Sequence, residues 1–387
     1  MKKILRISLI VLASLGGMAA IAVGVLAFLM SRPLNRQDME KFLHTEIVKL
    51  RAKPQLQAAS LSLVSRSENL QLSFEADNSD ESTFHSASVG KLFTTVLVAK
   101  KVEEGSIDWD TPVSSLLDSA LLQGLVDPAD LPGITIADLL GHTSGMADYF
   151  DGRRNDGGPT LASLMIEEPQ RFWPPEGLLD HSRRYQSPGR RGSYLYSDSG
   201  FIVLGLVIEA LYGQPFTTAV HQHIFDRLGM NDSYYPTRSS PKNQPIKPLL
   251  PSWLEGANLA DSQSLSADWS GGGVASTHAD LQRFAAALLD NSLISRNTLD
   301  FLSQKRNSFI HGVQYGLGIM TIEFGAFMPL LAKLPAMTGH MGILGTQLFI
   351  EPETGTSIVI NLGASGHMED SVRLLISAAS ALARLQD

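Results

Sequence analysis

The chain of 387 residues contains no cysteine, which excludes disulfide bonds, thiol chemistry and cysteine-ligated metals. It also lacks a dense run of Lys and Arg beyond its first residues, and its formal net charge is −8. This charge pattern argues against nucleic acid as a partner. The pattern G-x-S-x-G is absent as well. Its absence argues against the α/β-hydrolase fold, in which that turn carries the nucleophile.

The N-terminus contains a long apolar segment. Residues 7–30 carry no charged side chain and follow Lys2, Lys3 and Arg6. A helix of about 20 apolar residues spans a bilayer, whereas a cleaved signal peptide has an apolar core of about 7–15. We therefore expect residues 1–36 to form a cytoplasmic tail, a transmembrane signal-anchor and a linker, with a cleaved signal peptide as the alternative. The basic flank predicts a single-pass membrane protein with a cytoplasmic N-terminus and an extracytoplasmic domain, in the periplasm or at the cell surface.

The order of helical and strand patterns predicts the fold class. Apolar spacing predicts a helix at residues 37–51, and alternation predicts a β-hairpin over 58–65 and 70–76. Strand patterns return from about residue 313, and residues 368–386 form an amphipathic helix pattern. These features predict an α/β (α+β) fold with one antiparallel sheet flanked by the N- and C-terminal helices.

The middle of the chain has a different pattern from its two ends. Residues 110–280 lack strand alternation and contain short helical runs between turns. We therefore expect a single domain at 37–387, with a sheet lobe at about 37–110 and 281–387. A mostly helical lobe at about 111–280 would be inserted into it, and a cleft between two such lobes is where a small-molecule site is expected.

Ser88 and Lys91 are three residues apart in "FHSASVGKLFTT", so a helix beginning here would place both on one face. A serine hydroxyl is a weak nucleophile until a nearby base takes its proton, and a buried lysine can serve as that base. The alternative is a helix cap followed by a surface lysine. The same spacing recurs at Ser239 and Lys242, where a proline and loop-like neighbours disfavour a helix.

Two further stretches have polar residues that could face a cleft. Tyr196 and Asp198 precede an apolar helical run, where Asp198 could equally be a helix cap. His340 and Gly342 stand where a strand is expected to begin, and glycine there allows close backbone approach to a ligand. Each stretch alone also fits ordinary capping or turn chemistry.

Together, the three stretches resemble the serine β-lactamase and penicillin-binding (DD-peptidase) family, in the class C-like branch that includes DD-carboxypeptidases and esterases. That family has S-x-x-K, then Y-x-N, then K-T-G or H-T-G. The matches here are residues 88–91, 196–198 and 340–342, in the same order. Flanking stretches such as "LLGHTSGM" and "YGLG" agree, and the resemblance extends over about residues 38–386.

The resemblance implies a serine hydrolase without metal or organic cofactor. Ser88 would attack a carbonyl to form an acyl-enzyme, while Lys91 and Tyr196 share the proton transfers. The oxyanion would lie between the N–H groups of Ser88 and Ile343, the residue after Gly342. The implied partner is a small-molecule or peptide substrate, with cell-wall peptide, D-alanyl peptides and β-lactams as candidates.

Two departures from the family pattern affect the expected substrate. Asp198 stands where asparagine is usual, and a carboxylate near Lys91 favours the ammonium and makes the lysine a poorer base. Tyr196 then gains weight as proton acceptor. His340 and Met341 replace a cation and a threonine, so the site is poorer in positive charge than a carboxylate binder needs. The alternatives are therefore a carboxylesterase acting on uncharged acyl esters and a catalytically inactive binding module with the same fold.

Other polar residues receive structural interpretations. His142, in "GHTSG", is expected to be structural, and Glu167 with its neighbour is expected to be solvated. His221 and His223 are two residues apart and would face different ways on a helix, so no metal site is expected there.

Overall fold

The computed structural model describes residues 32–75, 82–150 and 152–386. The predicted membrane segment at residues 7–30 lies outside the described residues, so its role stays a prediction. In the described ranges, no single helix has the length and hydropathy needed to cross a bilayer. One helix pair, Asp198–Tyr212 with Phe216–Leu228, meets the criteria jointly and is bent by 72°.

An eight-stranded antiparallel sheet forms the centre of the fold, in the order β2-β1-β12-β11-β10-β9-β8-β7. The N-terminal hairpin therefore joins strands from the C-terminal part of the chain, as the sequence predicted. The strands are β1 (Ser60–Ser65), β2 (Leu70–Phe74), β7 (Asn307–Ile310), β8 (Val313–Tyr315), β9 (Met320–Ile322), β10 (Met337–Gly342), β11 (Thr346–Glu351) and β12 (Thr356–Asn361).

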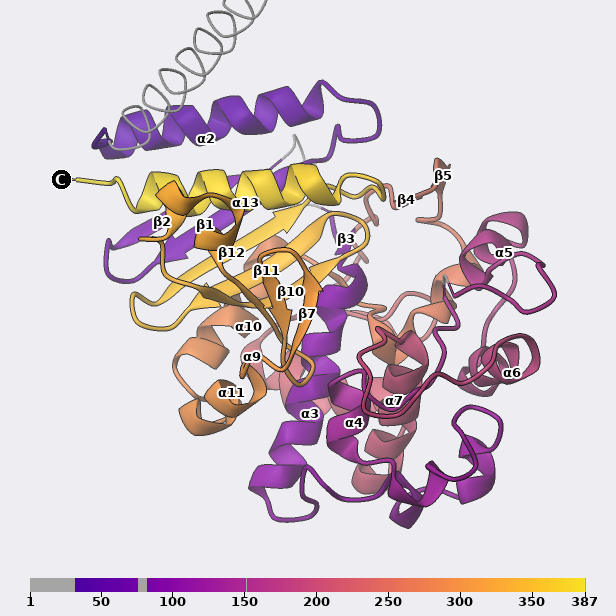
Figure 1. Cartoon of the computed structure of the whole chain (residues 1–387). Helices are drawn as coiled ribbons and strands as arrows, with labels where there is room; N and C mark the ends of the chain where they lie inside the picture. The colour runs from indigo at the N-terminus through magenta and orange to yellow at the C-terminus, as the bar shows by residue number, and fades with distance from the viewer. Residues whose placement is uncertain (1–31, 76–81, 151, 387) are drawn as a thin grey trace, which may run out of the picture.

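Helices cover both faces of this sheet. The first and last described helices, α2 (Arg36–Arg51) and α13 (Met368–Leu382), run side by side over one face (Figure 1). Met39, Leu43 and Ile47 of α2 are fully buried in the core of that face, because their spacing places them on one side of the helix. The opposite face is covered by α10 (His278–Leu289). The predicted α/β class with a sheet flanked by the terminal helices is confirmed.

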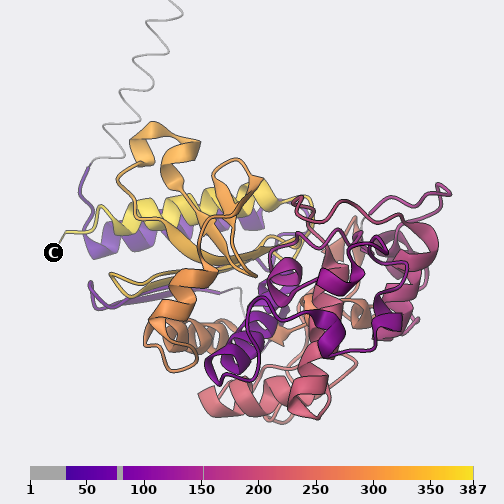
Figure 2. The same ribbon diagram turned by 60° about the horizontal axis from the view of Figure 1, so that its bottom comes forward.

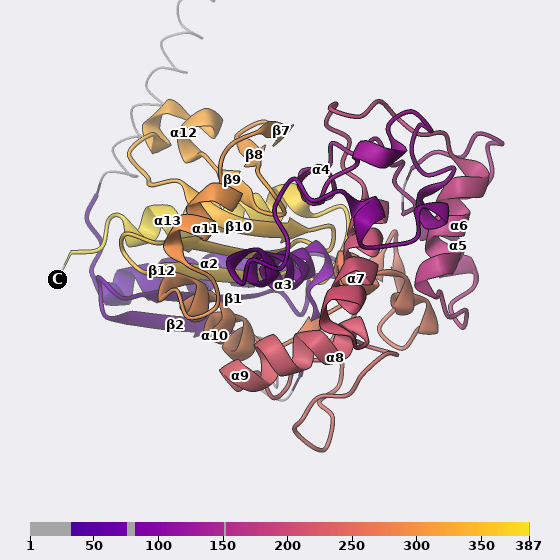
Figure 3. The ribbon, with the colours of Figure 1, turned by 90° about the horizontal axis from the view of Figure 1, so that it is seen from below.

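The middle of the chain forms short helices at one end of the sheet (Figure 2). Figure 3 shows α3 (Lys91–Glu103) between the sheet and α7 (Asp198–Tyr212), and α3 contacts both β10 and α7. The limits of the two predicted lobes stay a prediction. The remaining α-helices are α4 (Ile136–Leu140), α5 (Leu161–Glu167), α6 (Pro175–Tyr185), α8 (Phe216–Val220), α9 (Asp226–Leu228), α11 (Arg296–Leu302) and α12 (Phe324–Phe327); the short strands are β3 (Phe84–His85), β4 (Trp253–Leu254), β5 (Ala257–Asn258) and β6 (Ala275–Ser276).

Candidate active site

Ser88 lies in a 3-10 turn, Ala87–Gly90, directly before α3. The α-helix itself begins at Lys91, so Ser88 is in the turn that precedes it. Side chains three residues apart eclipse each other in a 3-10 turn, so the turn still brings the pair together. The Nζ of Lys91 lies 3.2 Å from the Oγ of Ser88.

The turn is held by close backbone contacts that require glycine. A Cβ atom at Gly90 would lie 2.0 Å from the carbonyl oxygen of Gly272, and one at Gly342 would lie 2.8 Å from the Cβ of Ala87. Ala87 itself has a φ of 47°, a left-handed conformation that costs free energy in a residue with a side chain. Gly342 thus lets β10 approach the turn that carries Ser88, and that contact fixes the position of Ser88 beside the strand.

Lys91 is fully buried behind Ser88. It donates to a carboxylate oxygen of Asp198 and to the carbonyl oxygen of Gly271, in addition to its contact with Ser88. An ammonium has three N–H donors, so each of them has an acceptor here. The Nζ also lies 5.2 Å from the centroid of the Tyr196 ring, within the range of a cation–π contact. The arrangement suits a charged lysine.

Tyr196 hydrogen-bonds to the side chain of Ser88. Burial raises the pKa of Tyr196 well above its ordinary value, and the charge of Asp198 raises it further, whereas the bond to Ser88 acts in the opposite direction. The hydroxyl is therefore protonated at neutral pH. Asp198 is positioned by Asp148, whose carboxylate accepts the backbone N–H of Asp198 at 2.9 Å.

A buried chain of hydrogen bonds links the Tyr196 loop to β10. The N–H of Ser197 donates to Nδ1 of His142 (3.1 Å), so in the neutral ring the proton is on Nε2, 3.0 Å from the Tyr315 hydroxyl. That hydroxyl lies 3.1 Å from Nε2 of His340, and His340 Nδ1 lies 2.7 Å from the carbonyl oxygen of Met341. All of these groups can form their hydrogen bonds at once if His142 donates to Tyr315, Tyr315 donates to His340, and His340 donates to the carbonyl oxygen of Met341.

Both histidines in this chain of hydrogen bonds, His142 and His340, are neutral. Burial lowers the pKa of His340 to about 3, and the charge of Lys91 lowers it further, whereas the bond to the Met341 carbonyl acts in the opposite direction. Burial likewise lowers the pKa of His142 well below its ordinary value. His340 is fully buried and supplies no cation to a ligand; the structural interpretation of His142 agrees with its place in this chain.

A cavity of about 280 Å³ opens in front of Ser88. We call it the reactive cavity. The N–H groups of Ser88 and Ile343 donate to no acceptor among the described residues, as two groups awaiting an oxyanion would. Its walls are formed by Ala87, Ser88, Asp148, Phe150, Tyr196, Asp198, Asp268, Phe309, Met320, Met341, Ile343 and Met368.

The structure thus brings most of the predicted site residues together. Ser88, Lys91, Tyr196 and Asp198 are in mutual contact, and Met341 and Ile343 border the cavity at the end of β10. His340 lies behind the strand and is absent from the cavity wall in the described part of the chain. It also stands in the second half of β10, so the expected strand start at His340 is corrected.

Sequence reasoning missed several residues that shape the site. Asp148 and Asp268 line the cavity from irregular segments that carry no periodic signal. Tyr315 stands in the "YGLG" stretch, whose likeness to the family could have drawn attention to it.

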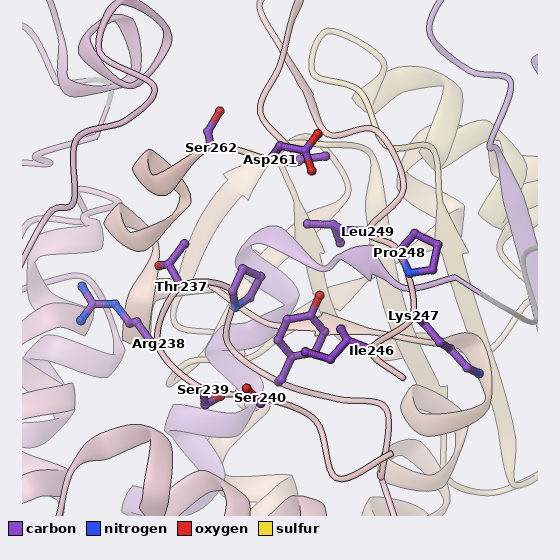
Figure 4. A pocket seen from close by; sticks show the side chains of 13 residues that line it. Thr237, Arg238, Ser239, Ser240, Ile246, Lys247, Pro248, Leu249, Asp261 and Ser262 are labelled. Carbon is purple, nitrogen blue, oxygen red and sulfur yellow. The ribbon is translucent and has the colours of Figure 1, made fainter. Parts of the chain in front are cut away.

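The second S-x-x-K stretch is not assembled in the same way. Ser239 lies 3.0 Å from Nε2 of His221, whereas Lys242 pairs with Asp226 at 3.9 Å. Ser239 lines a different cavity of about 650 Å³, in which Figure 4 shows it beside Ser240. Only the first stretch therefore has its serine and lysine in contact.

Within the described ranges, no group of three or more His, Asp or Glu side chains is placed to hold a metal ion.

Comparison with known proteins agrees with this geometry. The family model described as Beta-lactamase matches residues 64–382, which is most of the chain. The chain belongs to the Beta-lactamase family. Members of this family of serine hydrolases need not hydrolyse β-lactams, so the family fixes the fold and the class of chemistry.

Individual relatives within the Beta-lactamase family are distant. "Penicillin-binding protein 4*" of Bacillus subtilis (strain 168) is 26% identical over 259 residues, which are 61% of this chain and 52% of that protein. The chain thus spans about half the length of this curated relative. A D-stereospecific amidohydrolase from Streptomyces sp. superposes with a TM-score of 0.72 at 22% identity, covering 86% of this chain and 97% of that one. D-amino acid amidase from Ochrobactrum anthropi SV3, complexed with L-phenylalanine amide, gives 0.73 at 19% identity, covering 89% and 99%. These two likenesses show the fold.

Proposed function

We propose that this protein hydrolyses an amide or ester through an acyl-enzyme at Ser88. The observation that carries the proposal is the contact of one serine hydroxyl with both Lys91 and Tyr196, at the wall of a cavity with two unpaired N–H groups. A serine with a proton acceptor and an oxyanion site is the arrangement that acyl transfer requires.

The steps follow from the positions of these groups. The Ser88 oxygen forms a bond to the substrate carbonyl carbon while its proton passes to the Lys91–Tyr196 pair. The carbonyl oxygen becomes an oxyanion held by the N–H groups of Ser88 and Ile343. The pair returns the proton to the leaving amine or alcohol as the C–N or C–O bond breaks. Water then forms a bond to the ester carbon while its proton passes to the same pair. The pair returns that proton to the Ser88 oxygen as the bond between the acyl carbon and this oxygen breaks.

Lys91 and Tyr196 act jointly in this proposal. Lys91 is held as a charged donor by Asp198 and Gly271, so it has no lone pair to offer at rest. The pKa of Tyr196 is raised well above its ordinary value, so its hydroxyl is not ionised at rest either. Proton transfer from Ser88 therefore requires the form of the pair that has lost one proton to solvent. In that form the tyrosinate of Tyr196, stabilised by the Lys91 ammonium, accepts the Ser88 proton.

The charge of the cavity favours substrates without a carboxylate beside the scissile bond. Among the described residues of its wall there is no Lys, Arg or His, and three are aspartates. Amides and uncharged esters fit this wall better than β-lactams or peptides ending in a free carboxylate. The relatives described as amidohydrolase and amidase support the amide, and the penicillin-binding relative supports a peptide.

Intact-mass analysis tests the proposal directly. The protein would be incubated with a panel of β-lactams, peptides ending in D-alanyl-D-alanine, and short-chain p-nitrophenyl esters. We expect an acyl adduct that is absent in Ser88→Ala and retained in Ser239→Ala, the matched change in the other S-x-x-K stretch. An adduct that persists in Ser88→Ala contradicts the mechanism.

Two alternative functions predict different outcomes in the same experiment. A carboxylesterase acting on uncharged acyl esters is favoured by the apolar side chains of Phe309, Met320 and Met341 in the wall, and it would turn over the esters alone. An inactive binding module would form no adduct with any compound. Retention of Ser88, Lys91 and Tyr196 in contact argues against that second reading.

We also propose that residues 7–30 anchor the protein in a membrane with its catalytic domain outside the cytoplasm. The uncharged segment and its basic flank support this placement. Alkaline extraction of membranes should leave the full chain in the pellet. Release of a chain that lacks its first residues would instead indicate a cleaved signal peptide.

A further inference from the structure

A small apolar cavity adjoins the reactive cavity, and we call it the annex. It has a volume of about 30 Å³, room for a group the size of a methyl. Asp268 lies in the wall of both cavities, as do Ala87, Phe150 and Ile343. The apolar residues that belong to the annex alone are Met165, Leu254, Leu259, Leu265 and Leu344.

Asp268 places an unfilled acceptor at this junction. Its carboxylate accepts no hydrogen bond from the described residues, and its side chain is 18% exposed. A Cβ atom built on Gly272 would lie 2.5 Å from one of its oxygens and 2.7 Å from the carbonyl oxygen of Ala87. The carboxylate therefore sits beside the backbone that leads directly into Ser88.

His85 places an unfilled donor beside that acceptor. Its Nδ1 accepts the N–H of Ala87 at 3.2 Å, so the neutral ring carries its proton on Nε2. His85 is 4% exposed, and its Nε2 is buried with no hydrogen-bond partner among the described residues. The distance from Nε2 to Asp268 Oδ2 is 3.8 Å, too long for a hydrogen bond. Leaving such a donor unpaired costs free energy, so a bound group that fills it gains by doing so.

The charge around this pair selects the kind of group. Asp148, Asp198 and Asp268 all line the reactive cavity, and among the described residues of its wall there is no Lys, Arg or His. The field in the cavity therefore attracts a cation and repels a carboxylate. An ammonium next to a carbonyl, as at the amino end of a peptide, offers a donor for Asp268 and an acceptor for His85.

We propose that Asp268 and His85 form a subsite for the free amino end of a peptide-like acyl group. The ammonium donates to the carboxylate of Asp268, the adjacent carbonyl oxygen accepts from Nε2 of His85, and a small apolar side chain enters the annex. This inference rests on the proposed acyl-enzyme at Ser88, and it narrows the substrates to acyl groups that carry a positive amino end.

A matched pair of substrates tests the subsite in the full chain. The compounds are alanyl-alanine p-nitroanilide and its N-acetyl derivative, each in both enantiomeric forms, with p-nitrophenyl butyrate as a reporter of Ser88 chemistry. We expect at least a tenfold higher kcat/KM for the free amine in one enantiomeric form. In Asp268→Asn this ratio should fall toward one, mainly through KM. Asp261→Asn removes the same charge at the larger cavity and should keep the ratio.

The outcomes separate the subsite from the proposed function. Equal or better hydrolysis of the acetylated compound by the unmodified protein overturns the subsite, and this measurement needs no variant to fold. An equal fall of the ratio in Asp261→Asn also overturns it. Turnover of the butyrate ester without either anilide overturns the subsite and leaves the chemistry at Ser88 standing. Failure of all three compounds to react removes both.

Discussion

Lys91 and Asp198 form an ion pair directly behind Ser88, with no exposed surface on the lysine side chain and 10% exposure on the aspartate. Two charges removed from water in this way depend on each other, because neither can be hydrated when its partner is lost. The aspartate that departs from the family pattern is therefore a structural partner of the lysine as well as a neighbour of the reacting groups.

Replacing Asp198 with asparagine should destabilise the protein by about 3 kcal/mol, because a buried ammonium would lose its counter-charge. Urea denaturation of purified protein measures the change. Asp300→Asn removes one of the two acidic partners of Arg296 at the surface and should cost less than about 1 kcal/mol. Similar losses in the two variants would show that burial of the Lys91 pair carries no special weight.

The Tyr315 hydroxyl should matter more than that of neighbouring Tyr194. Tyr315→Phe leaves His142 without an acceptor and His340 without a donor, each costing about 1–3 kcal/mol. The Tyr194 hydroxyl is buried without a partner among the described residues, so Tyr194→Phe should be nearly neutral. Unfolding curves measure both.

Activity provides a second readout for Tyr315. We expect kcat to fall by about tenfold or more with a smaller change in KM, because these hydrogen bonds link Ser197, next to Tyr196, to Met341 in the cavity wall. If Tyr315→Phe is destabilised but keeps its kcat, Tyr315 stabilises the fold without positioning the groups around Ser88.

Gly90 should not accept a side chain. In Gly90→Ala the new Cβ would overlap the carbonyl oxygen of Gly272, 2.0 Å away, and backbone would have to move. We expect loss of acylation together with a lower melting temperature. Gly200→Ala is the matched control, since its Cβ would meet its nearest neighbour at an ordinary 3.5 Å. If Gly90→Ala is acylated at the same rate as the wild type, the turn can accommodate a side chain and its contact with Gly272 does not require glycine.

Acid should destabilise the fold through its buried histidines. The pKa of His340 is about 3 in the folded protein and about 6.5 in an unfolded chain, so below pH 6.5 the unfolded state binds the proton first. Stability is then lost as pH falls from about 6.5 toward 3, by up to about 1.4 kcal/mol per pH unit for each such residue. The pKa of His278, lowered by burial to about 4, adds to this slope.

His340→Gln should make the dependence of the unfolding free energy on pH shallower, by up to about 1.4 kcal/mol per pH unit, because one proton fewer is taken up on unfolding. The free energy of unfolding at pH 7, 6 and 5 supplies the measurement, and His44→Gln, at an exposed position, is the control. Identical slopes in wild type and His340→Gln would contradict the assignment of a neutral buried imidazole at this position.

The sequence predicts those parts of the molecule that depend on local patterns. Helix α2, the hairpin β1–β2 and helix α13 follow from periodic apolar residues, and the pair Ser88 and Lys91 follows from a spacing of three. Asp268 and Tyr315 could not be assigned roles in this way, because their partners lie far along the chain and on different elements. The position of His340 also needed the fold, since the two faces of a strand differ only in what packs against them.

Strand β1 pairs on one side with β2, built from the next residues, and on the other with β12, built from nearly the last ones. The same holds for the reactive cavity, because Ser88 is an early residue whereas Met341 and Ile343 come late. A chain emerging from the ribosome therefore carries Ser88, the proposed nucleophile, long before the cavity around it can form. The proposed site is assembled only after β10 has been made, so a chain cut before β10 would keep Ser88 and lack the N–H group of Ile343.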